Sequence, residues 1–247
     1  MDFQQARFNM VEQQIRPWDV LNFDLLDALE SIPREKFVQE NQQGYAYADI
    51  SLALPNGGRM LEPKIVARMI QGLSLTKTDR VLEVGTGSGY ATAVLATLAG
   101  SVRTFDTDGS QQARAKAALQ QLGFDNIQYQ TEDGLAAQSE RYDAIYVGGA
   151  LREVPEALLQ SLNDGGRMVI VVGGSPVQCC LQIIKQGDAF TQKTLFDTQI
   201  VYLNEQGGKA DLFDFYPIIG HPLKNRAPMG TRFSCVRGLC FAGGFLQ

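Results

Sequence analysis

The stretch VLEVGTGSGY, residues 81–90, constrains the fold more than any other part of the chain. It places Gly85, Gly87 and Gly89 at alternate positions directly after a short apolar run. Glycine is used where the backbone is left-handed or where another group approaches it closely. A strand that turns into a helix presents free N–H groups and the positive helix end at the carboxyl edge of a parallel sheet. The stretch therefore predicts a strand–turn–helix unit that binds a ligand at its turn.

From Arg80 onward, short β-rich runs alternate with helical patterns, which is typical of a parallel sheet covered by helices. The expected strands are residues 80–84, 102–106, 127–130, 142–147 and 167–172, and the expected helices are residues 90–99, 110–122 and 155–162. Two later runs, residues 177–185 and 194–203, predict a terminal hairpin that adds an antiparallel strand. The pattern predicts an α/β fold with a mostly parallel seven-stranded sheet and helices on both faces.

The chain divides into three expected segments. Residues 1–75 form an N-terminal helical segment, in which a long polar connection at 39–62 is a candidate lid or substrate loop. Its expected helices are residues 5–15, 23–31 and 64–73. Residues 76–204 hold the ligand-binding sheet, and residues 205–247 show no clear periodicity and form a C-terminal extension.

Composition and net charge argue against several classes of partner. The formal net charge of -5 and the absence of a basic run argue against a nucleic-acid substrate. No apolar run approaches the roughly 18 residues of a membrane helix, and the N-terminus lacks a signal-peptide pattern, so we expect a cytoplasmic protein without a membrane partner. The cysteines have no C-x-x-C spacing, so we expect buried thiols and no metal site. The sequence gives no oligomeric state.

The spacing of the glycines and the residue before them indicate the ligand. The pattern is G-x-G-x-G rather than G-x-G-x-x-G, and Glu83 lies two residues before Gly85. A pyrophosphate gains nothing from a nearby carboxylate, whereas a ligand with a cationic sulfonium and an ammonium group is favoured by it. The combination favours S-adenosyl-L-methionine over NAD.

Two further acidic residues support this cofactor. Asp106 ends the second expected strand about 20 residues after Gly85, where a carboxylate can accept hydrogen bonds from ribose hydroxyls. Asp133, followed by Gly134, comes after the third strand and can accept from an adenine amino group. Each signal has a structural alternative: a tight strand-to-helix turn, a helix cap at Asp106 or Asp108, and a plain turn at Asp133. Together and in this order they favour a cofactor site.

Five stretches of the sequence together indicate a known family: MVEQQIRP (10–17), IPREKFV (32–38), DRVLEVGTGSGY (79–90), YDAIYVGGA (142–150) and DGGRMVIVVG (164–173). They resemble the protein-L-isoaspartate O-methyltransferases, a family of class I S-adenosylmethionine-dependent methyltransferases. The resemblance implies a Rossmann-like sheet with a reversed final strand, and isoaspartyl carboxylates in damaged proteins or peptides as methyl acceptors. It carries cofactor contacts onto Glu83, Gly85, Gly87, Gly89, Asp106, Asp133 and Gly134, to which we add the intervening Thr86 and Ser88.

The acceptor loop departs from the family pattern. The family loop reads like G-Q-T-I-S-Q-P, whereas residues 57–63 read GGRMLEP, with Arg59 at the threonine position and Leu61 at the serine position. Arg59 can hold an acceptor carboxylate bidentately, or it can be a solvated surface arginine. A carboxylate with a pKa of about 4 is already ionised and needs no general base. We therefore assign no catalytic residue, and we expect His221 to serve packing or solvation.

Three functions remain open from the sequence. The first is a methyltransferase acting on isoaspartyl residues. The second keeps the cofactor but uses a small carboxylic acid or hydroxyl compound. The third is a noncatalytic S-adenosylmethionine-binding protein whose acceptor pocket Leu61 has closed. Methylation of nucleic-acid amino groups is less favoured, because residues 148–150 read GGA rather than an N-P-P-Y type of turn.

Overall fold

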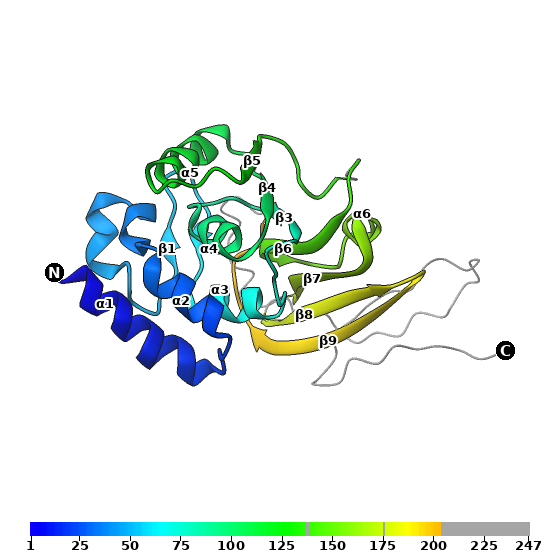
Figure 1. Cartoon of the computed structure of the whole chain (residues 1–247), viewed down its shortest axis with the longest axis horizontal. Helices are drawn as coiled ribbons and strands as arrows, with labels where there is room; N and C mark the ends of the chain where they lie inside the picture. Colours follow the sequence, from blue (N-terminus) through cyan, green and yellow to red (C-terminus); the bar gives the residue numbers. More distant parts are fainter. Residues whose placement is uncertain (137–138, 175, 204–247) are drawn as a thin grey trace, which may run out of the picture.

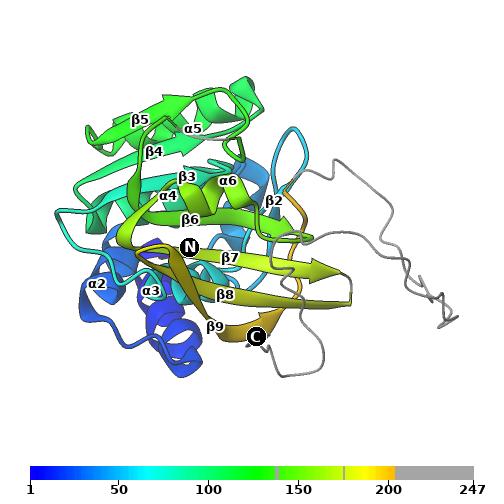
Figure 2. The same ribbon diagram turned by 90° about the vertical axis from the view of Figure 1, so that its right-hand side faces the viewer.

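The computed structural model describes residues 1–136, 139–174 and 176–203, and its centre is a seven-stranded sheet in the order β5-β4-β3-β6-β7-β8-β9 (Figure 2). The strands are β3 (Arg80–Val84), β4 (Ser101–Phe105), β5 (Ile127–Gln130), β6 (Tyr142–Leu151), β7 (Leu162–Gly174), β8 (Val177–Gln186) and β9 (Ala189–Thr198). The first five are parallel, and β8 is antiparallel to both of its neighbours. This confirms the predicted Rossmann-like α/β fold.

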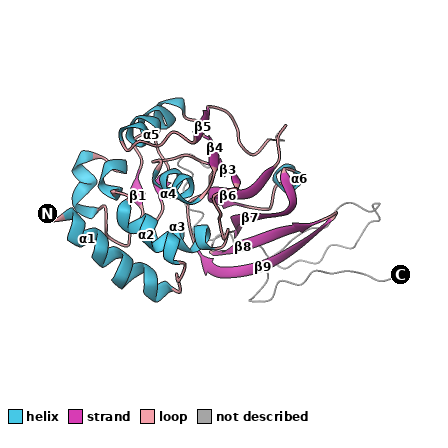
Figure 3. Cartoon of the chain, viewed as in Figure 1, coloured by secondary structure: helices cyan, strands magenta, loops and turns pink. Residues whose placement is uncertain are grey.

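The helices lie on both faces of the sheet (Figures 1 and 3). They are α1 (Phe3–Asn9), α2 (Phe23–Ser31), α3 (Pro63–Gln71), α4 (Tyr90–Leu98), α5 (Gly109–Gln121) and α6 (Glu156–Gln160). The expected first helix continues beyond α1 as a π-helical stretch, Met10–Ile15, and a short 3-10 turn, Arg16–Trp18. Side-chain caps start the first two α-helices, because Asp2 accepts from Gln5 N and Asn22 accepts from Leu25 N.

The terminal hairpin begins at Val177, as the sequence predicts, but its second strand begins earlier than expected. Its second strand starts at Ala189, directly after a two-residue turn at Gly187 and Asp188, and ends at Thr198, so the expected strand at 194–203 was placed too late. The first half of β9 carries polar side chains at an outer edge of the sheet and therefore lacks an apolar strand signal. The expected helix at 155–162 is also shorter, because Leu162 already belongs to β7.

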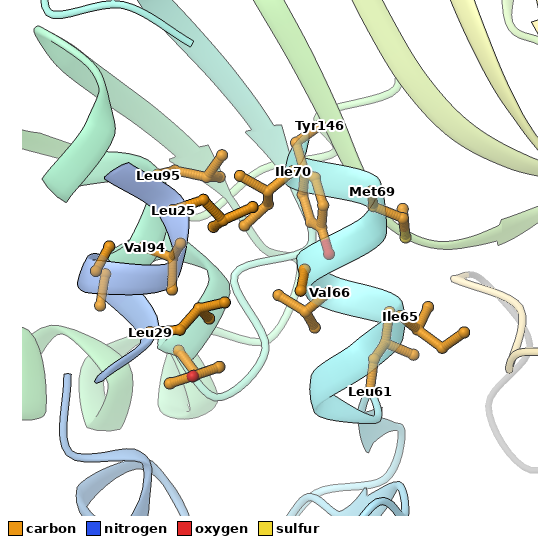
Figure 4. Close-up of a cluster of buried hydrophobic side chains, with 14 of the residues drawn as sticks. Leu25, Leu29, Leu61, Ile65, Val66, Met69, Ile70, Val94, Leu95 and Tyr146 are labelled. Atoms are coloured by element: carbon orange, nitrogen blue, oxygen red, sulfur yellow. The ribbon is translucent and has the colours of Figure 1, made fainter. Parts of the chain in front are cut away.

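Two hydrophobic clusters pack against the two faces of the sheet. One joins the N-terminal helices and α4 to the sheet, and it includes Leu25, Leu29, Ile65, Val66, Met69, Ile70, Val94, Leu95 and Tyr146 (Figure 4). The other packs α6 on the opposite face through Leu158 and Leu159. Residues of the expected segment 1–75 thus share a core with the sheet. The segment boundaries stay a prediction, and residues 205–247 lie outside the described residues.

The long connection at 39–62 contains a small hairpin, β1 (Leu52–Ala53) and β2 (Arg59–Met60), after a 3-10 turn at Glu40–Tyr45. Its strands pair as Leu52 with Met60 and Ala53 with Arg59. Gly57 and Gly58 both have positive φ, 98° and 74°, which lets the chain reverse within a few residues. Because both glycines line a cavity with residues that follow β3 and β4, the hairpin lies at the carboxyl edge of the large sheet.

Candidate active site

A cavity with about 900 Å³ of empty space, open to solvent, lies at the carboxyl ends of β3, β4 and β5. One wall is formed by residues 56–59 of the hairpin, and another is the glycine turn with Gly85 and Gly87. Asp106 and residues 132–134 follow β4 and β5 and complete the opposite wall.

The glycine turn has the geometry that its sequence predicts. Gly85, Gly87 and Gly89 have φ values of 91°, 51° and 86°, which other residues rarely adopt. A Cβ at Gly89 would lie 3.0 Å from the Cβ of Ala115 in α5, so this glycine also permits close helix packing. The turn therefore needs glycine for its backbone conformation and for the approach of neighbouring groups.

Asp106 faces the cavity at the end of β4. Its Oδ2 accepts from Gly87 N at 2.9 Å, and its Oδ1 accepts from Asp108 N at 2.9 Å. The helix-capping role belongs instead to Asp108, whose Oδ1 accepts from Ser110 N and Gln111 N at the start of α5. These backbone hydrogen bonds, with those from Ser110 and Asn56 side chains, lower the pKa of Asp108 to about 2. Asp106 is therefore the carboxylate that joins the glycine turn to the cavity.

Asp133 and Gly134 lie on the same wall. Asp133 Oδ1 accepts from Leu135 N at 2.9 Å, and its exposed carboxylate lines the cavity. A Cβ at position 134 would lie 2.7 Å from the Cβ of Phe105, so glycine lets this segment pack against the end of β4. Asp133 and Gly134 therefore form a turn and also line the cavity, so the structural and the functional predictions for these two residues are compatible.

Glu83 does not line the cavity. Successive side chains of a strand point to opposite faces, and Val84 takes the cavity side while Glu83 points toward α4. There its Oε2 accepts from Thr92 Oγ1 at 2.6 Å, and its Oε1 has no hydrogen-bond partner in the described part of the chain. Complete burial raises the pKa of Glu83 to about 8, against the lowering effect of the Thr92 hydrogen bond. A direct contact of Glu83 with the cofactor stays a prediction.

Three other predicted residues belong to the turn but do not line this cavity. Thr86 is buried, with its hydroxyl 2.7 Å from that of Thr104, and Ser88 lines a neighbouring cavity. Gly89 begins α4. Of the nine predicted cofactor residues, the cavity brings together Gly85, Gly87, Asp106, Asp133 and Gly134.

The two residues that replace the family hydroxyls lie in different places. Arg59 lines the cavity, and its guanidinium donates from Nε to Ser51 Oγ and from Nη2 to the Ser51 carbonyl, both at 2.7 Å. Leu61 is buried beside Ile65 at the beginning of α3, within the N-terminal hydrophobic cluster (Figure 4). Leu61 therefore does not fill the cavity.

Sequence reasoning missed several residues of the cavity. Gln111 of α5 donates from Nε2 to the Gly87 carbonyl at 2.8 Å, and Asn56 of the hairpin donates to Asp108 Oδ2 at 2.7 Å. Residues 201–203 lie along β6, where Leu203 N donates to the Ala150 carbonyl at 3.0 Å. These contacts join distant parts of the chain, so no local motif indicates them.

The charge of the wall fits a cationic ligand. Among the described residues that line the cavity, four carry a carboxylate, and Arg59 is the one cation. The carboxylates are those of Asp106, Asp108, Glu132 and Asp133. A sulfonium and an ammonium group are favoured in such a cavity, and adenosine hydroxyl and amino groups find acceptors there. The described residues thus fit S-adenosyl-L-methionine.

The sheet with one reversed strand, the glycine turn after β3 and the carboxylates after β4 and β5 define a class I S-adenosylmethionine-dependent methyltransferase. The family model for protein-L-isoaspartate(D-aspartate) O-methyltransferase (PCMT) matches residues 6–208. The chain belongs to this family, and it is a methyltransferase that uses S-adenosyl-L-methionine.

Relatives of similar length support this membership. A protein-L-isoaspartate O-methyltransferase of Roseiflexus sp. (strain RS-1) is 37% identical over 219 residues, which are 88% of this chain and 99% of the relative. One from Desulfotalea psychrophila (strain LSv54 / DSM 12343) is 38% identical over 204 residues, 82% of this chain and 95% of the relative. The recognition made from the sequence stretches is therefore confirmed.

Two solved structures share the fold. A protein-L-isoaspartate O-methyltransferase superposes with a TM-score of 0.70 at 24% identity, covering 81% of this chain and 65% of that one. A PCMT structure from Plasmodium falciparum, in complex with S-adenosyl-L-homocysteine, gives a TM-score of 0.68 at 19% identity, covering 82% and 98%. Within the described residues, no helix is long and apolar enough to span a bilayer, and no cluster of three or more potential metal ligands occurs.

Proposed function

We propose that this enzyme transfers a methyl group to the carboxylate of isoaspartyl residues in proteins or peptides. The observation that carries the proposal is the family match over residues 6–208, which includes both the glycine turn and the hairpin that meet at the cavity. When bound, the cofactor supplies a sulfonium methyl group, which a carboxylate oxygen accepts as the carbon–sulfur bond breaks. No proton moves in this displacement, so the residues of the chain act by binding and orienting.

We assign a part of the cofactor to four of the predicted residues that line the cavity. Gly85 and Gly87 let the methionine portion approach the turn, and Asp106 accepts from the ribose hydroxyls. Asp133 accepts from the adenine amino group. The backbone hydrogen bonds that Asp106 receives fix its carboxylate before the ligand enters. These residues would hold the cofactor in the same cavity that the hairpin lines.

Arg59 is our candidate for binding the acceptor carboxylate. An anionic acceptor must enter a cavity that already contains four carboxylates, and Arg59 is the cation in the described wall that offsets their repulsion. Its two hydrogen bonds to Ser51 hold the guanidinium in place. This charged fork would replace the hydroxyl groups that the family loop carries at positions 59 and 61.

The two alternative functions, a small carboxylic acid as acceptor and a noncatalytic cofactor-binding protein, use different parts of this site. A small carboxylic acid would use the same cofactor wall and the same arginine, so only an acceptor assay separates it from an isoaspartyl peptide. The noncatalytic alternative required Leu61 to close the pocket, and Leu61 lies in the hydrophobic core instead. A cytoplasmic location and the lack of a nucleic-acid partner stay predictions from the sequence.

The test uses labelled S-adenosyl-L-methionine with matched peptides that contain either isoaspartate or aspartate. We expect base-labile label in the isoaspartyl peptide only, because a methyl ester is hydrolysed by base. Calorimetry with the same protein measures cofactor binding independently. Cofactor binding without label would refute the isoaspartyl acceptor and favour a small molecule, whereas no binding would refute the cofactor site itself.

A further inference from the structure

The β1–β2 hairpin forms one wall of the cavity. Its base is fixed in the core, since Leu52 and Met60 are buried. Its tip, residues 55–58, is exposed and reverses through the two positive-φ glycines. The hairpin also carries Arg59, the candidate acceptor-binding residue, so the position of its tip decides how closely acceptor and cofactor walls face each other.

Asn56 connects this exposed tip to α5 on the far side of the cavity. Its Nδ2 donates to Asp108 Oδ2 at 2.7 Å and also contacts Ser110 Oγ. Within the described residues, these are the only side-chain hydrogen bonds that the tip makes with the rest of the protein. Asp108 also caps α5, and its backbone N–H donates to the carboxylate of Asp106, which is predicted to bind the ribose hydroxyls. A single amide thus ties the acceptor hairpin to the cofactor wall.

We propose that Asn56 is a positioning residue that holds the hairpin closed over the bound cofactor and sets Arg59 toward the methyl group. The role of Asn56 in orienting Arg59 toward the acceptor rests on the proposed function. Its role in closing the hairpin over the cofactor does not, because that role depends only on the contact between the hairpin and α5. The Leu54 side chain supports the same closed position, since a Cβ at Gly87 would lie 3.6 Å from Leu54 Cδ1. The hairpin therefore meets both the glycine turn and the start of α5.

Loss of the contact lets the tip populate open positions. The dissociation constant of a ligand that needs the closed position is inversely proportional to the closed fraction, so it rises as that fraction falls. For a charge-assisted hydrogen bond at the surface we expect about a fivefold rise in the cofactor dissociation constant and in the acceptor KM. The chemistry within the closed complex is unchanged, so kcat should stay within about twofold.

The experiment exchanges the two partners. Asn56→Asp places two carboxylates face to face and should weaken S-adenosyl-L-homocysteine binding in calorimetry. In the double variant Asn56→Asp with Asp108→Asn, the new amide Nδ2 at 108 can donate to the new carboxylate at 56, while its Oδ1 still caps α5, a position where Asn and Asp are equally favoured. Asn41→Asp is the matched control, because it adds the same charge at an exposed site of the neighbouring 3-10 turn.

The expected result is a rise in dissociation constant and KM for Asn56→Asp, recovery to within about twofold in the double variant, and no change in the control. A double variant as weak as Asn56→Asp, or an Asn56→Asp protein that binds normally, would overturn the proposal. Equal thermal unfolding midpoints in all variants exclude a general loss of structure. If the unchanged protein fails to methylate isoaspartyl peptides, the proposed function fails, and the calorimetric comparison still decides the role of Asn56.

Discussion

Glu83→Gln should stabilise the cofactor-free protein, and by an amount that depends on pH. Burial raises the pKa of Glu83 to about 8 from an ordinary value of 4.5. Between these two values the folded protein holds a proton that the unfolded chain has released, so the free energy of unfolding falls as pH rises. The slope is about 1.4 kcal/mol per pH unit. Below pH 4.5 both states are protonated, and the effect is absent.

The size of the effect follows from this window. Between pH 5 and pH 8 the carboxyl group lowers the free energy of unfolding by about 4 kcal/mol, which is large beside the usual total of about 5–15 kcal/mol. Glutamine keeps the shape of the side chain and an oxygen that can accept from Thr92 Oγ1, but it does not ionise. The variant should therefore match the unchanged protein near pH 5 and exceed it near pH 8.

Urea unfolding at pH 5, 6.5 and 8 measures this difference, with cofactor removed. Glu40→Gln is the matched control, because Glu40 is exposed and the substitution removes the same charge. We expect the gap between Glu83→Gln and the unchanged protein to widen with pH, and the control to show no such trend. The reasoning is refuted if the gap is constant, or if it narrows toward pH 8.

Three further results are expected. Arg59→Ala should raise the acceptor KM about tenfold and leave the cofactor dissociation constant within about twofold, with Arg59→Lys intermediate; a parallel loss of both would count against acceptor binding. Gly89→Ala should lower Tm by about 6 °C, clearly more than Gly123→Ala, because both glycines have positive φ but only the first faces a neighbouring Cβ at 3.0 Å. Above pH 8, Glu83→Gln should weaken S-adenosyl-L-methionine more than S-adenosyl-L-homocysteine in calorimetry, since only the former carries a sulfonium charge; equal losses would show that Glu83 does not sense that charge.

The sheet and its glycine turn were predictable because their signals are local. Strand and helix periods repeat within a few residues, and the alternate glycines mark a turn without reference to the rest of the chain. The predicted position of β9 was wrong because the first half of this strand is polar. The strand lies at an edge of the sheet, where few side chains are buried and the sequence therefore has no alternating apolar pattern. The longer extents of β6 and β7 depend on pairing with each other, which no single segment reveals.

The candidate site was predictable in part for the same reason. Asp106 and Asp133 follow strands, so topology alone brings them to one edge of the sheet. Asn56 and Asp108 are 52 residues apart and meet only because the hairpin folds over α5, and no spacing rule describes that contact. Strand alternation could have placed Glu83 and Val84 on opposite faces, but which of them meets the cavity depends on where α4 packs.

The buried Glu83 side chain links the stability of the fold to the cofactor cavity. A carboxyl group that is buried behind the turn, with one oxygen lacking a partner among the described residues, lowers stability at neutral pH and contributes no contact to the cavity wall. Its position on β3 nevertheless places it directly beneath the turn that the cofactor must approach. A positive charge in the cavity favours the ionised form, so cofactor binding should lower the pKa of Glu83 and recover part of the stability lost on burial. The same carboxyl group that weakens the empty fold would then strengthen the complex, which links the stability of this protein to its methyl donor rather than to its acceptor.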